Sequence, residues 1–315
     1  MLRAATALLD DREEPALEAA LTVFRNLTVS NEGALLLAAH AETLQKIAAL
    51  LNAQPLKLIP ERVVRLTLAV LGNVTRVFDG ANVIADCAVT APVLAVLKKC
   101  ALYDAETVHA ATLVILNAAT HDQGKRLAIH LHAVEICLAV LAKVLQAKPT
   151  FQRCEATFHV ELTRCLVSAV MALSTVEDAK PPVVEFGVEP LVACLHHESA
   201  AVRTSARIAI NSACEAPRGV AAFVAKLLPE HALLVDVLGA KSIPALLPFL
   251  RDVDDDAQRH ALSALVELVR HESGAHEVVQ CLQFIETLVE LLAQDARDVR
   301  SLAVAALQHV VQVSC

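Results

Sequence analysis

The clearest shortage in this chain of 315 residues is of aromatic side chains, which make up 3% of it and include no Trp. Without them the chain lacks platforms on which the bases of a single-stranded nucleic acid could stack. The formal net charge of -8, with a pI of about 5.9, gives no overall attraction to nucleic acid or to an anionic membrane. Neither nucleic acid nor membrane is therefore expected as a partner.

Glycine is also scarce, and long apolar runs are missing. Only 8 Gly argue against a β-rich or dinucleotide-binding fold, which would need more tight turns. No run approaches about 18 apolar residues, so no transmembrane helix is expected, although hydrophobic residues make up 56% of the chain. The first residues do not form a signal peptide, because Asp10 and Asp11 follow a very short apolar stretch.

The 9 cysteines are scattered and form no Cys-x-x-Cys pair. Their odd number and the lack of a secretory signal predict free thiols in a reducing compartment. A cytoplasmic location is expected, with cytoskeletal or ciliary structures as the more specific places. The histidine pairs His130/His132 and His196/His197 lack the spacing of zinc ligands, so neither a metal nor a cofactor is expected.

Catalytic motifs are missing as well. Gly124-Lys125-Arg126 lacks the first glycine of a phosphate-binding loop, and neither GxSxG nor GxGxxG occurs. Cys154 and His159 could form a nucleophile pair, but no third group or oxyanion hole accompanies them in the sequence. We therefore expect that the chain is not an enzyme and has no small-molecule substrate.

The stretch 240–270 contains the pattern from which the chain is built. Ile243, Leu246 and Leu250 recur at the spacing of one apolar helical face. The acidic residues 252–256 interrupt this face and can cap a second amphipathic helix. Neither short helix can bury its apolar face alone, so the pair needs copies beside it.

The second helix of this pair has seven copies, which begin at Glu18, Arg65, His109, Arg164, Arg203, Arg259 and Arg300. Four copies carry an asparagine eight residues after their start: Asn26, Asn73, Asn117 and Asn211. In the other three copies, Ala172, Glu267 and His309 stand at or next to that place. Most spacings fall near 40–47 residues, the length of about one helical repeat. Two longer spacings predict insertions near 147–160 and 217–239, and the second is expected to add a packed helix pair.

These copies resemble the armadillo-repeat family, with some HEAT character. The family pattern appears as Ala240-Lys-Ser-Ile243-Pro244, as Phe24-Arg-Asn26-Leu27 and as Leu71-Gly-Asn73-Val74, while Asp298-Val299-Arg300 is closer to HEAT units. The resemblance implies an all-α, right-handed superhelical solenoid of about six to seven armadillo-like repeats, in a single domain over 1–315. The chain begins inside a repeat and ends without a polar cap, which predicts a fragment of a longer chain. The residues expected in the core are Leu21, Leu27, Leu68, Leu113, Leu166, Ile208, Leu265 and Val304.

The resemblance also implies a surface that binds a protein partner. In armadillo proteins the matching asparagine lines the concave face and hydrogen-bonds the backbone of an extended peptide, for which an amide has donors and an acceptor. The residues expected to contact a partner are Asn26, Asn73, Asn117, Asn211, Arg25, Arg76 and Arg207. The alternative is that each Asn satisfies the backbone at the end of its own helix or at the next helix start.

Two further features bear on the ligand. Nuclear-import receptors of this family carry Trp four residues before the asparagine, where this chain has Thr22, Ala69, Leu113 and Arg207, so an import-signal groove is not expected. The arginines that begin most copies could form a basic stripe for acidic peptides, or a ladder that pairs with acidic links such as Asp254 or Asp298.

The predicted function is a non-enzymatic scaffold or adaptor that holds a peptide or helical segment of a partner protein along the concave face. The alternative is an armadillo-type co-chaperone or assembly factor for motor proteins such as myosin or axonemal dynein, which rests on analogy of fold. A tetratricopeptide module upstream of this chain would favour the co-chaperone.

Overall fold

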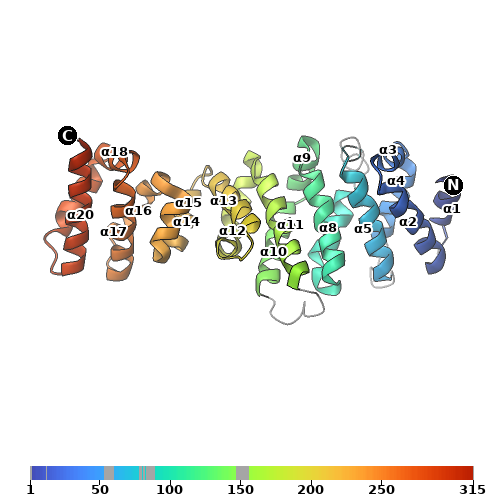
Figure 1. Cartoon of the computed structure of the whole chain (residues 1–315), viewed down its shortest axis with the longest axis horizontal. Helices are drawn as coiled ribbons and strands as arrows, with labels where there is room; N and C mark the ends of the chain where they lie inside the picture. The colour runs from blue at the N-terminus through green and yellow to red at the C-terminus, as the bar shows by residue number, and fades with distance from the viewer. Residues whose placement is uncertain are drawn as a thin grey trace. The chain divides into compact units, whose positions relative to one another are not determined.

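A computed structural model describes residues 2–11, 13–52, 60–77, 80, 82, 89–146 and 156–314. Every regular element in these ranges is a helix, and no β-strand occurs in them (Figure 1). This confirms the all-α prediction. The chain divides into two compact units, residues 1–209 and 210–315, and the division falls inside helix α13 (Ala200–Ala213). The sequence pattern shows no such division, because the repeat continues through α13.

Helical repeats stacked in two layers build the N-terminal unit. The long last helix of each repeat packs on the last helix of the next, in the order α2 (Glu14–Thr28), α5 (Glu61–Thr75), α8 (Ala105–Ala118) and α11 (Ala156–Ser174) (Figure 1). A second layer packs in the same order and contains α4 (Ala41–Asn52), α7 (Thr90–Lys98), α10 (Ala133–Gln146) and α12 (Lys180–Leu195). The shorter elements are α1 (Leu2–Leu8), α3 (Asn31–Ala38), η2 (Cys100–Leu102), α9 (Asp122–His130) and η3 (Glu177–Ala179).

The C-terminal unit continues the pattern around helix α17 (Asp255–Val269), which packs on the helices before and after it. Its other elements are α14 (Gly219–Leu227), η4 (Leu228–Glu230), α15 (His231–Leu238), η5 (Gly239–Ser242), α16 (Ile243–Leu250), α18 (Glu272–Gln280), α19 (Leu282–Leu291) and α20 (Arg297–Ser314). The predicted pair over 240–270 is α16 and α17. All seven predicted copies fall on last helices: α2, α5, α8, α11, α13, α17 and α20.

The two predicted insertions have different outcomes. The segment 217–239 contains two helices, α14 and α15, which bury Phe223, Leu227 and Leu234. Because α14 begins at Gly219, in the place of a regular first helix, α15 alone is additional, rather than the predicted pair. Of the segment 147–160, residues 147–155 lie outside the described residues, and the rest begins α11.

The repeats that end in α5, α11 and α20 each have three α-helices rather than the pair that the sequence pattern predicts. The missed element is the short first helix, which a recurring glycine sets against the end of the preceding repeat. A Cβ on Gly33 would lie 1.9 Å from the carbonyl oxygen of Leu27, and one on Gly124 would lie 2.2 Å from that of Ala118. Such an approach is possible only without a side chain. The same contact, to the carbonyl six residues earlier, recurs at Gly33, Gly80, Gly124, Gly219 and Gly274.

The eight residues predicted for the core differ in how far they are buried. Four are fully buried (Leu21, Leu68, Leu166 and Leu265), and two are half-buried (Leu27 and Leu113). The prediction was wrong for Ile208 and Val304, which are 46% and 41% exposed. Their helices, α13 and α20, have small apolar residues on more than one face, so hydrophobicity alone does not select the buried side. The buried positions there include Ala206, Ala209, Ala303 and Ala306.

By length and composition alone, the segment Gly219–Leu250 is apolar enough to cross a membrane, as are the bent pairs α3–α4 and α9–α10 if each is taken as one span. The prediction that no segment has this property was therefore too strict. In the structure the segment is broken into three α-helices by the two short 3-10 helices and by Gly239, whose φ is 55°.

Candidate functional site

The last helices of the N-terminal unit each leave one stripe of side chains outside the core. Because α2, α5, α8 and α11 pack side by side in matching register, these stripes adjoin one another. We call this surface the last-helix face, and its members are Thr22, Asn26, Val29, Ala69, Gly72, Asn73, Arg76, Leu113, Leu116, Asn117, Thr120, Ser168, Met171, Ala172 and Thr175. All of them are half-buried or exposed. Three of the four predicted asparagines belong to this face.

The amides of Asn73 and Asn117 tie each repeat to the one before it. Asn73 Nδ2 donates to Thr28 Oγ1 at 3.1 Å. Asn117 Nδ2 donates to the carbonyl oxygen of Gly72 at 3.0 Å and to Thr75 Oγ1 at 3.3 Å. Each bond therefore runs to the preceding last helix, whereas the sequence suggested the end of the same helix or the start of the next. Among the described residues, the Oδ1 atoms of both amides have no donor.

Asparagine and hydroxyl occur together in this ladder. Thr28 and Thr75 are fully buried, and each hydroxyl also donates to a carbonyl of its own helix. At the next step, from α8 to α11, Ala119 stands where the threonine would be and Ala172 where the asparagine would be. The donor and the acceptor are thus absent at the same step. This pairing indicates that the amide holds adjacent repeats together.

The other predicted contact residues are distributed differently. Arg25 and Asn26 lie exposed on α2. Arg76 Nη2 donates to the carbonyl oxygen of Val29 at 2.9 Å and to Asn31 Oδ1 at 3.3 Å, so it closes the C-terminal end of α2. Partner binding by any of these residues stays a prediction.

Arg207 and Asn211 lie on α13, on either side of the division between the two units. Arg207 is half-buried in the N-terminal unit. Asn211 belongs to the C-terminal unit, where its Nδ2 donates to the carbonyl oxygen of Val237 at 3.1 Å. The binding role predicted for both also stays a prediction.

Four of the five arginines at the start of the last helices are engaged with protein groups: Arg65, Arg164, Arg203 and Arg259. Arg65 pairs with the next repeat, through Asp104 at 3.3 Å and Glu106. Arg203 Nη1 donates to the carbonyl oxygens of His197 and Glu198 at 2.7 and 2.8 Å. Arg164 and Arg259 pair with acids of their own helices, Glu161 and Asp256. Arg65 alone of these four makes the predicted inter-repeat contact, and exposed pairs of this kind stabilise by only about 0–1 kcal/mol.

His109 occupies the arginine position in α8 and faces two side chains of α11. Cys165 Sγ lies 3.4 Å from His109 Nε2 and 3.8 Å from Glu161 Oε1, and the three atoms lie within 4.8 Å of one another. Arg164 Nε donates to Glu161 Oε2 at 2.8 Å, and this bond lowers the pKa of Glu161. Burial lowers the pKa of His109 and raises that of Cys165 to about 11. No sequence pattern reveals this group, because more than one repeat length separates His109 from the other two residues.

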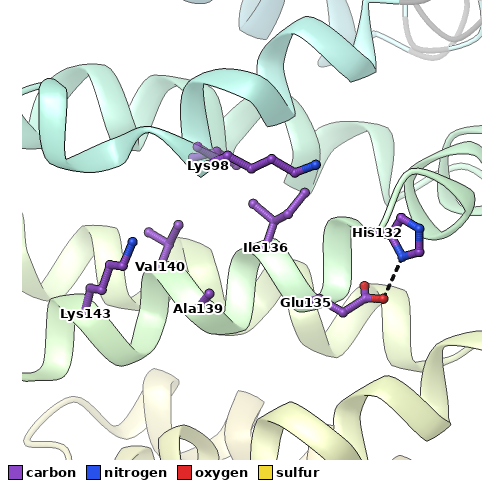
Figure 2. A pocket seen from close by; sticks show the side chains of 8 residues that line it. Lys98, His132, Glu135, Ile136, Ala139, Val140 and Lys143 are labelled. Carbon is purple, nitrogen blue, oxygen red and sulfur yellow. Dashed lines mark hydrogen bonds and ion pairs between the residues drawn. The ribbon is translucent and has the colours of Figure 1, made fainter.

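A shallow apolar hollow lies between α7 and α10 (Figure 2). Leu97, Ile136, Ala139 and Val140 contribute its apolar lining, with Lys98, Lys143, His132 and Glu135 around them. His132 Nδ1 lies 2.9 Å from Glu135 Oε1, as the dashed line in Figure 2 shows. The lining residues do not place a nucleophile beside a base. The hollow suits an apolar side chain better than a reaction.

The described cysteines bear out the expectation of free thiols. Cys100, Cys137, Cys165, Cys194, Cys214 and Cys281 are all unpaired. Burial raises the pKa of Cys137 and Cys194 to about 12, which keeps them protonated and poorly nucleophilic. Cys154, half of the possible nucleophile pair, lies outside the described residues, and His159 Nε2 bonds the carbonyl oxygen of Val144 at 2.9 Å.

Comparison with known proteins places the fold among armadillo-type repeats. No protein-family model matches the sequence, and no curated protein matches it significantly. A crystal structure of an engineered protein is 17% identical, with 98% of this chain and 78% of that chain covered and a TM-score of 0.62. A structure from work on a phosphorylation switch in the interaction between cadherin and β-catenin is 16% identical, covers 98% and 52%, and has a TM-score of 0.55. A designed armadillo repeat protein covers 85% and 99%, at 16% identity and a TM-score of 0.47. The armadillo-like repeat fold predicted from the sequence is confirmed.

Proposed function

We propose that this chain is a non-enzymatic scaffold that holds an extended segment of a partner protein on the last-helix face of residues 1–209. The observation that carries the proposal is the repetition of this face. Four adjoining helices present half-buried small, apolar and amide side chains at matching positions. A ligand that crosses the helices would meet a similar environment at each repeat, as an extended chain requires.

The fixed amides suit a peptide backbone. Because Asn73 and Asn117 are already held by the preceding repeat, little side-chain entropy is lost when they bind a ligand. Each retains an Oδ1 acceptor, which can take a hydrogen bond from a backbone N–H of the partner. These contacts would not select particular side chains of the ligand, so selectivity has to come from the residues around the amides.

Gly72 gives the face a place for close approach. It lies inside α5, where glycine is about 1 kcal/mol less favourable than alanine. Packing does not require a glycine there, since the nearest atom to an added Cβ would be Val114 Cγ2 at 3.8 Å. A ligand backbone that passes over α5 would explain the absence of a side chain at this position.

The class of function agrees with what is known of one protein of similar fold. The β-catenin structure comes from work on its interaction with cadherin, another protein. At 16% identity this supports a protein-binding scaffold in general terms and names no partner for this chain.

A binding experiment with face variants tests the proposal. A partner captured from extract and identified by mass spectrometry would be titrated against the wild type, Ala69→Arg and Met171→Arg, with Gln45→Arg on α4 as the matched control. Both face positions are half-buried on last helices, and Gln45 is exposed in the other layer. We expect the face variants to bind at least about 10-fold more weakly, a loss of about 1.4 kcal/mol, and the control to bind normally. Equal affinities for all four proteins, with equal helicity by circular dichroism, would refute the last-helix face as the binding surface.

A further inference from the structure

We infer that His109, Glu161 and Cys165 are three protein ligands of a zinc-type divalent cation that joins two neighbouring repeats. His109 belongs to α8, and Glu161 and Cys165 lie one turn apart on α11. The site is separate from the partner-binding proposal, since none of the three residues is a member of the last-helix face as defined above.

The distances between the donor atoms fit a tetrahedral ion. Bonds of the usual zinc lengths at tetrahedral angles place the ligand atoms about 3.4–3.6 Å from one another. Here Sγ lies 3.4 Å from His109 Nε2 and 3.8 Å from Glu161 Oε1. All three atoms lie within 4.8 Å of one another, so small side-chain rotations close the remaining gap. Three protein ligands leave a fourth position for water.

The chemistry of the donors points to zinc rather than to calcium or magnesium. Imidazole nitrogen and thiolate sulfur suit a borderline-soft ion, whereas calcium and magnesium take oxygen ligands. Two neighbours already orient the donors. Arg164 Nε holds Glu161 Oε2 at 2.8 Å, as a second layer of hydrogen bonds often does at metal sites, while Arg164 Nη2 contacts Oε1, the atom that would bind the ion. The ring of Phe158 packs edge-on against His109, with 5.1 Å between the ring centroids.

The competing explanation is a hydrogen-bonded contact between repeats. In the preceding repeat, Arg65 occupies the position of His109 and pairs with Asp104 and Glu106. A fully buried thiol adds little to such a contact, because S–H is a weak donor and sulfur a weak acceptor. Arg164 Nη2 also contacts Glu161 Oε1, and this hydrogen bond has to break before Oε1 can bind the ion. The Arg164 side chain is 39% exposed and has solvent into which this end can turn.

Binding of the cation to these three side chains needs no oxidant or reductant. The Cys165 thiol loses its proton to solvent as the sulfur–metal bond forms, so one proton is released for each ion bound. His109 donates the lone pair of neutral Nε2, which requires the proton on Nδ1. Glu161 binds as the carboxylate.

Titration of the whole chain with Co²⁺ under reducing conditions tests the inference directly. Cobalt in a site of this kind gives a thiolate charge-transfer band and the intense visible bands of tetrahedral coordination. We expect one equivalent to bind, Zn²⁺ to displace it, and His109→Gln to weaken it at least about 10-fold. Cys165→Ser should abolish the charge-transfer band, while the matched control Cys194→Ser, at another fully buried cysteine, should keep it. No saturable band, or a band that survives in Cys165→Ser, would overturn the assignment.

A second measurement covers variants that fold poorly. Glu161→Gln changes a side chain that is only half-buried, so the fold should tolerate it while losing a charged ligand. Zn²⁺ at about 100 times its dissociation constant should raise the melting temperature of the wild type by about 5 °C. The rise should be clearly smaller in Glu161→Gln and absent in Cys165→Ser. A rise of equal size in all three proteins would place the ion elsewhere and refute the site.

Discussion

The hydrogen bond between Asn73 and Thr28 should couple two neighbouring repeats measurably. Asn73 Nδ2 lies 3.1 Å from Thr28 Oγ1, and the threonine is fully buried between its neighbours. The perturbation is a double-mutant cycle with Asn73→Ala, Thr28→Val and both changes together. Valine keeps the shape of the threonine side chain, so the cycle removes hydrogen bonds without creating a cavity.

The magnitude follows from two opposing contributions. A typical intramolecular hydrogen bond contributes about 0.5–1.5 kcal/mol to stability. Replacing asparagine by alanine in a helix regains roughly 0.5 kcal/mol of helix propensity. Asn73→Ala alone should therefore cost only about 0.5 kcal/mol. The propensity contribution cancels in the cycle, so the coupling energy should be near 1 kcal/mol.

Urea unfolding followed by circular dichroism gives the four free energies of unfolding. Because repeats need not unfold in a single step, hydrogen exchange of amides in α2 and α5 should supply a local measurement alongside it. Asn26→Ala is the matched control: this asparagine occupies the same repeat position but lies exposed on α2. The control should show the gain in helix propensity and no coupling to Thr28.

A coupling energy below about 0.3 kcal/mol would refute the ladder, because independent sites are additive to about that precision. If Asn73→Ala also weakened partner binding in that case, the amide would serve the ligand rather than the stack of repeats. If the coupling energy is near the expected value and Asn73→Ala leaves partner binding unchanged, the Asn73 amide serves only the stacking of repeats.

The remaining predictions concern backbone contacts, the core and pH. Gly124→Ala should destabilise the fold by more than about 2 kcal/mol, since the new Cβ would lie 2.2 Å from a carbonyl oxygen. Gly72→Ala should instead stabilise it by up to about 1 kcal/mol. Urea unfolding measures both free energies, and equal effects of the two substitutions would contradict the roles given to these glycines. Leu265→Asp should unfold the C-terminal unit by burying an unpaired charge, and protected amides throughout that unit would contradict the assigned register. His197 has a pKa lowered by burial and accepts a bond from the Ser199 N–H at 3.1 Å, so the folded state resists its protonation. Stability should fall as the pH drops through about 6.5, the value of the unfolded chain, and His197→Asn, which keeps an acceptor, should reduce that fall in melting temperature; an unchanged pH dependence would contradict this.

The helices and their order could be predicted because their signal is local. Ile243, Leu246 and Leu250 mark the face of α16, and they lie within one short segment. The short first helices that begin several repeats were missed for a related reason. Their signal is a single glycine such as Gly33 or Gly124, and the meaning of that glycine becomes visible only beside the carbonyl it approaches.

The roles of the candidate site residues were harder to predict. The sequence aligned Asn73 and Asn117 but could not show that their amides reach back to Thr28 and Thr75. Ile208 has the same local pattern as buried residues, yet it is 46% exposed because α13 packs through its alanines. An amphipathic pattern indicates that one face of a helix is buried. In an alanine-rich helix, small apolar residues lie on several faces, so the pattern does not identify the buried one.

That this chain is a stack of short amphipathic helices can be read from its residues, because helical periodicity depends on residues three and four positions apart. Which polar groups meet is visible only in the folded chain. Asn73 finds Thr28, and His109 finds Glu161 and Cys165, across distances of about one repeat length or more along the chain. Such contacts depend on how neighbouring repeats are set against each other, and that setting is fixed by packing, which no local pattern encodes.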